Sequence, residues 1–282
     1  MRKKRKSSLT LIAILLIAGF FGLKPQQAHQ VTTVAENIST TVTQTKNKTK
    51  QSSSATNTKA TSSTQLAALN YQSGQNPIVQ VNGGKSTLNP ADWHTNRVIY
   101  SSLDSLNRTS SANTAYLESR NVANDAFRVR QTVQPTGWHQ KFAGKTAILN
   151  RGHLVAYSLS KGISLDGNYD PSQQSGDQNN LKNLFTQTAF SNQRIQTIYE
   201  TEVRDALRAG KQVIYQPHAI FRGNELMPRG VQLQAISTDK TLNFNVYIFN
   251  VQPNFVFDYT TGRSVQGSMN VPTPANAPSF NN

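Results

Sequence analysis

The sequence contains no cysteine, which excludes disulfide bonds, thiolate nucleophiles and thiolate metal sites. Acidic residues are scarce: 14 Asp and Glu stand against 29 Lys and Arg, giving a formal net charge of +15 over 282 residues. Most of this excess lies in residues 1–65, which hold ten basic residues and a single acid, Glu36. The remainder carries a net charge of +6, which permits binding to a polyanion but does not require it.

A long apolar run occurs only near the N-terminus, where residues 9–23 follow five consecutive basic residues. This arrangement is typical of an export signal. A helix of this length spans about 22 Å, less than the roughly 30 Å hydrocarbon core of a bilayer, which favours a cleaved signal. We expect residues 1–28 to be a signal peptide or, if uncleaved, a membrane anchor. Either outcome predicts an extracellular protein, secreted or anchored at the outer face of the cell membrane.

Aromatic residues are missing from residues 31–65, which consist mostly of Thr, Ser, Asn, Gln, Lys and Ala. Such a composition buries too little apolar surface to offset the entropy lost on ordering. We therefore expect a disordered polar tether over residues 29–69 and a folded domain over residues 70–262. Residues 263–282 are expected to form a flexible C-terminal tail. The folded part is long enough for one hydrophobic core.

Three segments in the C-terminal half alternate apolar and polar residues and predict strands: 212–221, 231–238 and 242–252. The clearest helix begins at Ser191 or Asn192, the candidate N-caps, and ends at Gly210. Its apolar residues recur every three or four positions, which leaves Arg204 and Arg208 on the solvated side. These patterns predict an α+β fold with an antiparallel sheet core.

Two segments ahead of this helix are also expected to form strands. Residues 126–133 alternate with period two, which would place Arg128 and Arg130 on one face, where they would either line a phosphate groove or face solvent. Residues 145–159 contain two β-rich runs separated by Arg-Gly-His. We expect these runs to form a bent hairpin or strand pair with the Arg-Gly-His at the bend.

The residues at this bend and after it resemble two motifs of the DNA/RNA non-specific endonuclease family, the ββα-metal or His-Me finger nucleases. The hairpin tetrad of the family, Asp-Arg-Gly-His, is matched by residues 150–153, with Asn in the place of Asp. The second motif, Asn-x-x-x-Gln followed by Asn-Gln, is matched by Asn183, Gln187, Asn192 and Gln193. Glu200 lies eight residues beyond Asn192, as the family pattern expects. The resemblance covers about residues 120–260 and is closest to exported or surface DNases of the DNA-entry type. It implies a ββα-metal finger, a hairpin followed by the long helix.

The resemblance also implies a role for each matched residue. His153 is expected to be the general base that deprotonates the attacking water, and an imidazole near its usual pKa of about 6.5 suits that task. Asn192 is expected to bind Mg²⁺, with Mn²⁺ as a substitute, through its side-chain oxygen. Glu200 would hold metal-bound water or protonate the leaving oxygen through one such water. Arg151 and Asn183 would contact the phosphate or position the site, and cleavage would leave 5′-phosphate ends.

Structural alternatives remain for several of these residues. Asn192 could serve as an N-cap alone, and Glu200 could be an ordinary solvated helix charge. Trp138 could stack on a base or lie in the core. An amide cannot supply the charge of a carboxylate, so the role of Asn150 stays open and it is not placed in the catalytic set. The remaining histidines of the domain lack metal-ligand spacing and are expected to be structural: His94, His139 and His218.

The sequence therefore favours an exported, metal-dependent endonuclease that hydrolyses DNA. RNA stays open as a second substrate, because no residue that would recognise a 2′-hydroxyl is identifiable. The competing hypothesis is a surface receptor that captures DNA without cutting it, which the basic tether and Asn150 would suit. The combination of His153, Asn192 and Glu200 favours the enzyme. Membrane contact is expected only through an uncleaved N-terminal segment, and no protein partner is predicted.

Overall fold

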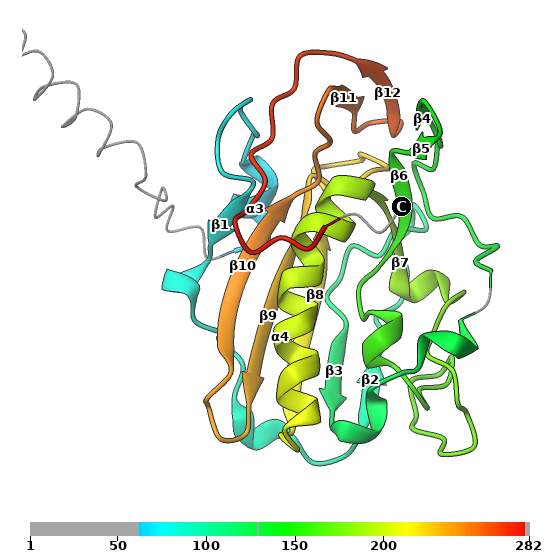
Figure 1. Cartoon of the computed structure of the whole chain (residues 1–282), viewed down its shortest axis with the longest axis vertical. Coiled ribbons are helices and arrows are strands. Elements are labelled where there is room, and N and C mark those ends of the chain that lie inside the picture. Colours follow the sequence, from blue (N-terminus) through cyan, green and yellow to red (C-terminus); the bar gives the residue numbers. More distant parts are fainter. Residues whose placement is uncertain (1–61, 129, 280–282) are drawn as a thin grey trace, which may run out of the picture. The chain divides into compact units, whose positions relative to one another are not determined.

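The computed structural model describes residues 62–128 and 130–279, all within one compact unit. The expected signal or anchor and most of the expected tether lie outside these residues. The main sheet has six strands: β1 (Ile78–Gln80), β2 (Arg97–Ile99), β3 (Thr114–Leu117), β8 (Val213–Ile220), β9 (Gly230–Ser237) and β10 (Asn243–Phe249). Their order is β1-β10-β9-β8-β3-β2, and every neighbouring pair is antiparallel (Figure 1). The predicted α+β fold with an antiparallel sheet core is confirmed.

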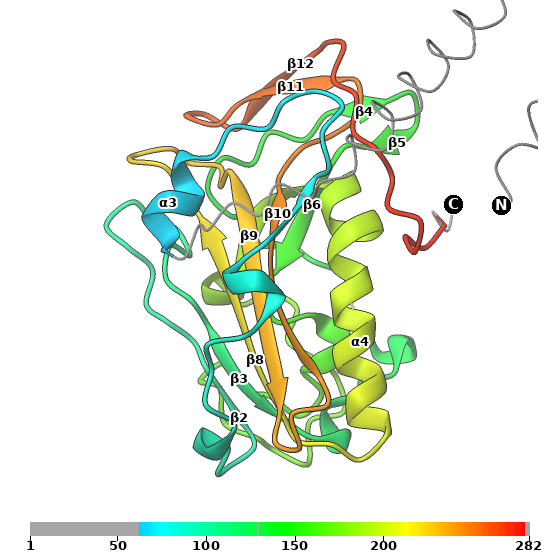
Figure 2. The ribbon, with the colours of Figure 1, turned by 90° about the vertical axis from the view of Figure 1, so that its left-hand side faces the viewer.

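The three central strands, β8 to β10, match the three alternating segments of the sequence to within a few residues. Helix α4 (Thr197–Arg208) covers one face of this sheet, with the rings of Tyr199 and Phe244 5.1 Å apart between their centroids. The short helix α3 (Ser63–Ala68) lies on the opposite side (Figure 2). Apolar side chains between these layers are almost fully excluded from solvent, as expected for a single close-packed core.

The folded domain begins earlier and ends later in the sequence than predicted. Helix α3 falls inside the expected tether, and its Leu66 is fully buried in the main core. At the other end, β11 (Phe255–Asp258) pairs with β12 (Arg263–Gln266), and Val271 is also buried in the core. None of the helices that the structure describes is long and apolar enough to cross a membrane.

The residues expected to be catalytic or metal-binding lie on or around a second, smaller strand pair and on the helical segment that follows it. Strand β6 (Leu149–His153) pairs antiparallel with β7 (Leu184–Thr188), and a π-helical turn (Ser191–Gln196) leads from β7 into α4. The sequence predicted a hairpin with Arg-Gly-His at its bend and residues 154–159 as the second strand. In the structure Arg-Gly-His lies within β6, whose partner is β7, so the predicted second strand is wrong. Residues 154–159 form a loop that ends in a 3-10 turn. Leu154, Val155 and Leu159 of this loop are fully buried. A buried loop needs apolar residues as a strand does, which explains why the run resembles a strand in the sequence.

Gly152 allows the close approach of β6 and β7. A Cβ atom at this position would lie 2.6 Å from the Cβ atom of Gln187, closer than side chains can pack. Any larger residue would push β7 away from β6. The glycine of the Arg-Gly-His sequence is thus explained by strand packing.

The strand predicted over residues 126–133 is also wrong. Residues Asp125–Phe127 form a 3-10 turn, and no strand occurs at 126–128 or 130–133. The side chain of Asn124 caps this turn by accepting a hydrogen bond from the Ala126 N–H, a local interaction that competes with strand formation. A small hairpin of β4 (Phe142–Ala143) and β5 (Thr146–Ala147) then precedes β6.

Candidate active site

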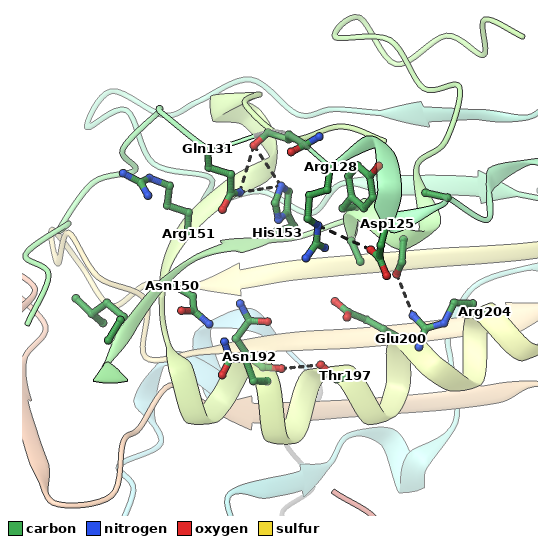
Figure 3. Close-up of a pocket in the computed structure, with 18 of the residues that line it drawn as sticks. Asp125, Arg128, Gln131, Asn150, Arg151, His153, Asn192, Thr197, Glu200 and Arg204 are labelled. Carbon is green, nitrogen blue, oxygen red and sulfur yellow. Dashed lines mark hydrogen bonds and ion pairs between the residues drawn. The ribbon is translucent and has the colours of Figure 1, made fainter. Parts of the chain in front are cut away.

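A pocket of about 780 Å³ opens between the end of β6 and the helix that begins at the π turn. It is lined by His153 from β6, by Asn192 from the π turn and by Glu200 from α4 (Figure 3). Arg151 and Arg128 line it as well. The structure thus brings together five of the seven residues that the sequence singled out as catalytic, metal-binding or substrate-binding. Asn183 and Arg130 are the exceptions.

The His153 ring is held from the loop that precedes β7. Its Nε2 atom lies 3.3 Å from the backbone carbonyl oxygen of Gln178 and 3.2 Å from Nε2 of Gln131. The Gln178 carbonyl oxygen can only accept a hydrogen bond and the Gln131 amide nitrogen can only donate one, so these two contacts favour opposite tautomers. In either tautomer of the neutral ring, one nitrogen keeps its lone pair and is able to accept a proton.

The surroundings of His153 favour its neutral form. Burial lowers its pKa from 6.5 to about 4, the Gln178 carbonyl opposes this shift, and the positive charge of Arg128 adds to it. The sequence predicted an ordinary pKa of about 6.5 for His153. It could not predict the lower value, because burial and the position of Arg128 depend on the tertiary structure. At neutral pH the imidazole is therefore almost entirely unprotonated.

Asn192 does not act as a helix N-cap, because the residue before Ser191 already has helical backbone angles and no side chain caps the helix. The Thr197 N–H instead bonds to the Asn192 carbonyl oxygen, five residues back. No side-chain hydrogen bond of Asn192 occurs within the described residues, so its amide is available in the pocket. The structural alternative weighed for Asn192 is thus not realised.

The π turn changes which residues share a face of the helix. On an ideal α-helix, residues eight apart are rotated by about 80°. A π turn contains one residue more than an α-helical turn, so the eight positions from Asn192 to Glu200 count as roughly seven α-helical steps. Seven steps rotate the side chain by about 700°, which leaves the two residues only about 20° apart around the helix axis. Both side chains accordingly face the same pocket (Figure 3).

Glu200 is held by Gln196, a residue that the motif comparison did not identify. The Gln196 Nε2 atom donates to Glu200 Oε1 at 2.7 Å and to the His153 carbonyl oxygen at 2.9 Å. Its Oε1 atom accepts from Gln187 at 2.9 Å. Burial raises the pKa of the Glu200 carboxyl group, while the Gln196 hydrogen bond and the charges of two arginines oppose the shift. A glutamine one turn before a glutamate on the predicted helix was the available sequence signal.

We predict that Gln196→Met lowers kcat by about 10- to 100-fold with a much smaller change in KM, because Glu200 and the end of β6 lose their common hydrogen-bond donor. The matched control is Gln232→Met, which removes a side-chain hydrogen bond to Asn245 within the main sheet. Both variants should lose roughly 1–3 kcal/mol of unfolding free energy. Steady-state kinetics and urea denaturation separate the two effects, and equal kcat values for both variants would contradict a positioning role for Gln196.

Asn183 is fully buried and does not line the pocket. Its Oδ1 atom accepts from the Val155 N–H at 2.8 Å, and its Nδ2 atom donates to the Val155 carbonyl oxygen at 2.9 Å and to Asp177 Oδ2 at 3.2 Å. Of the two expected roles, phosphate contact and positioning, burial leaves only positioning. Asn183 fixes the chain immediately after His153 and the loop that carries the Gln178 carbonyl.

Replacing Asn183 by Ala should lower the unfolding free energy by about 2–4 kcal/mol, because buried backbone and side-chain groups lose their partners. Asn124→Ala is the matched control, since Asn124 is exposed and makes a single capping bond; its cost should be about 1 kcal/mol. Urea denaturation followed by circular dichroism provides the comparison. Equal losses would mean that the Asn183 contacts contribute little.

Four arginines line the pocket: Arg128, Arg151, Arg204 and Arg208. Among the described residues only two acids do so, Asp125 and Glu200. Arg208 is exposed and Arg204 half-buried, so both lie on the solvated side of α4 as expected, and the pocket extends along this side. Arg130 is exposed and does not line the pocket. An excess of arginine suits an anionic ligand such as a phosphate backbone.

The arginine at the β6 end of the pocket is fixed in place. Arg151 Nε donates to the Val133 carbonyl oxygen at 2.7 Å, and the guanidinium lies 4.6 Å from the centre of the Trp138 ring. Trp138 itself packs partly against a small core cluster and partly lines the pocket. At the other end, Arg204 donates to Ser158 Oγ at 2.9 Å.

The oxygen atoms of the pocket fit a hydrated hard cation. The described residues contain no cluster of three or more His, Cys, Asp or Glu side chains that would hold a transition metal. Asn192 offers an amide oxygen that accepts no hydrogen bond from the described part of the chain, and the Glu200 carboxylate faces the same space (Figure 3). Mg²⁺ keeps most of its waters and needs only one or two protein oxygens. Asn150 also lines this part of the pocket.

Comparisons with known proteins agree with this geometry. The model of the DNA/RNA non-specific endonuclease family matches residues 85–239, more than half of the chain. The crystal structure of NucA from Streptococcus agalactiae with magnesium ion bound is 31% identical, with a TM-score of 0.56, covering 67% of this chain and 87% of NucA. The structure of Sda1 nuclease with bound zinc ion is 19% identical, with a TM-score of 0.52 and coverage of 68% and 97%, which supports the fold alone.

Proposed function

Since this chain belongs to the DNA/RNA non-specific endonuclease family and acts as an endonuclease on nucleic acid, we propose that it hydrolyses phosphodiester bonds with His153 as the general base. The observation that carries the proposal is the placement of a neutral imidazole opposite Asn192 and Glu200 in one arginine-lined pocket. DNA is the proposed substrate, with RNA as a second one.

In the proposed mechanism the arginines bind the phosphates and the unprotonated ring nitrogen of His153 takes a proton from the attacking water. Glu200 donates a proton towards the leaving O3′ atom, which its raised pKa favours. Cleavage of the P–O3′ bond leaves a 5′-phosphate. A Mg²⁺ ion held by Asn192 and by water next to Glu200, with Mn²⁺ as a substitute, would supply positive charge to the phosphate oxygens. The magnesium ion bound in the similar NucA structure supports this choice of metal.

The N-terminal sequence supports export. Five basic residues followed by the apolar run 9–23 form the pattern of a signal, and we propose that the nuclease domain acts outside the cell, released or anchored.

The proposal predicts that His153→Ala lowers the rate of plasmid cleavage by roughly 10²–10⁴-fold in Mg²⁺, and that a chelator abolishes cleavage by the wild type. His139→Ala is the matched control, because His139 is exposed and does not line the pocket. Product ends that accept ligation without a kinase would show the 5′-phosphate. Full activity of His153→Ala would refute the assignment, and a wild type that shifts DNA in a gel without nicking it would favour the receptor hypothesis.

A pH dependence follows from the low pKa of His153. The base is competent when neutral, so activity should persist below pH 6.5 and fall only as the pH drops towards about 4. The charge of Arg128 lowers the pKa values of both His153 and Glu200. In the pH profile of kcat/KM, Arg128→Gln should therefore move the midpoint of the acidic limb to a pH about 0.3 to 1 unit higher.

Arg130→Gln serves as the control for this profile, because it removes the same charge from an exposed position two residues away. It should leave the acidic limb in place. An identical shift in both variants, measured at fixed metal concentration, would mean that general surface charge rather than the Arg128 contact sets the limb.

A further inference from the structure

The β4–β5 hairpin presents an exposed aromatic side chain at the edge of the pocket. Phe142 is 57% exposed, so the face of its ring is open to a ligand. In the register of the hairpin Phe142 pairs with Ala147. Directly opposed residues of a two-stranded ribbon point to the same side, and Ala147 lines the pocket. Phe142 therefore lies on the side of the hairpin that continues the pocket wall.

The hairpin is joined firmly to the strand that carries His153. The Gln140 side chain donates to the Leu149 carbonyl oxygen at 2.8 Å and accepts from the Leu149 N–H at 3.1 Å. Lys141 Nζ donates to the Ser264 carbonyl oxygen at 2.9 Å, which braces the hairpin against β12. Figure 1 shows β4 and β5 at the end of β6, where Leu149 begins the strand. The position of Phe142 relative to the active site is thus fixed by the fold.

We infer that this hairpin extends the substrate groove and that Phe142 stacks on a nucleobase of the bound strand that lies beyond the nucleotide at the cut phosphate, because the hairpin adjoins Leu149, four residues before His153 on β6. The inference rests on the nuclease function proposed above. Lys145, exposed in the turn of the hairpin, supplies positive charge for the sugar-phosphate backbone, while the flat ring of Phe142 offers a surface that any base can cover. Stacking without base-edge hydrogen bonds would bind every sequence, as a non-specific nuclease requires.

The observations favour nucleic acid over a lipid surface as the occupant. Residues on both sides of the hairpin, Gln140 and Leu149, line the same pocket as His153, so a strand lying there would continue onto Phe142. The neighbouring exposed apolar residue Val265, on β12, is 62% exposed but does not line the pocket. It provides a matched control for the loss of exposed apolar surface.

The test compares full-length Phe142→Ala, Phe142→Trp and Val265→Ala on a single-stranded 20-mer and on a mononucleoside 5′-ester with a chromogenic leaving group. For the 20-mer, Phe142→Ala should raise KM by roughly 5- to 100-fold, the range expected for losing one stacked base, with little change in kcat. Phe142→Trp should restore KM, Val265→Ala should match the wild type, and all variants should cut the small ester equally. An unchanged KM, or equal losses on both substrates, would overturn the inference.

Binding measured in the His153→Ala background separates this inference from the proposed function. There, Phe142→Ala should weaken the anisotropy-based Kd for the 20-mer by the same factor whether or not His153 is the base. Retained binding of the 20-mer together with lost binding to anionic lipid vesicles would instead assign Phe142 to a membrane and refute base stacking. A wild type that cuts no nucleic acid would refute the proposed function, whatever the Phe142 variants bind.

Discussion

The side-chain amide of Gln196 is the contact on which the geometry of the site depends. It joins the last residue of β6, the buried Gln187 of β7 and the Glu200 carboxylate of α4. These three hydrogen bonds connect the strand pair to the helix, so the amide sets how far the helix is turned relative to His153. The π turn just before it brings Asn192 round to the same face. Each donor and acceptor of Gln196 has a partner, as a buried polar network requires.

Burial has matching consequences for the two titratable groups that face each other in the pocket. It lowers the pKa of His153 and raises that of Glu200, so it favours the uncharged form of each. A neutral imidazole is able to accept a proton, and a raised pKa makes the Glu200 carboxyl group easier to protonate. The two pKa shifts therefore suit a base and an acid on opposite sides of one phosphate. Positive charge comes from the arginines at the rim.

The motif resemblance grouped residues that the structure also brings together, but it did not predict how the site is built. It implied a shared site for His153, Asn192 and Glu200, and all three line one pocket. The strand that pairs with β6 was missed because it follows a loop of some thirty residues and its pairing is non-local. Local pattern also failed at residues 126–133, where a capped turn replaced the expected strand. The contact of His153 with the Gln178 backbone carbonyl could not be predicted either, because every residue has a backbone carbonyl and the sequence does not indicate which one lies near the ring.

The replacement of the family's Asp by Asn150 is compatible with catalysis on electrostatic grounds. Asn150 sits on β6 opposite Gln187 and lines the pocket, but it makes none of the contacts that hold His153 or Glu200. An aspartate there would add a third acid to a pocket with four arginines and would weaken its attraction for phosphate. The amide keeps an oxygen available while leaving the pocket more positive. The exchange therefore makes the pocket more attractive to a phosphate, which suits an enzyme and a protein that captures DNA equally.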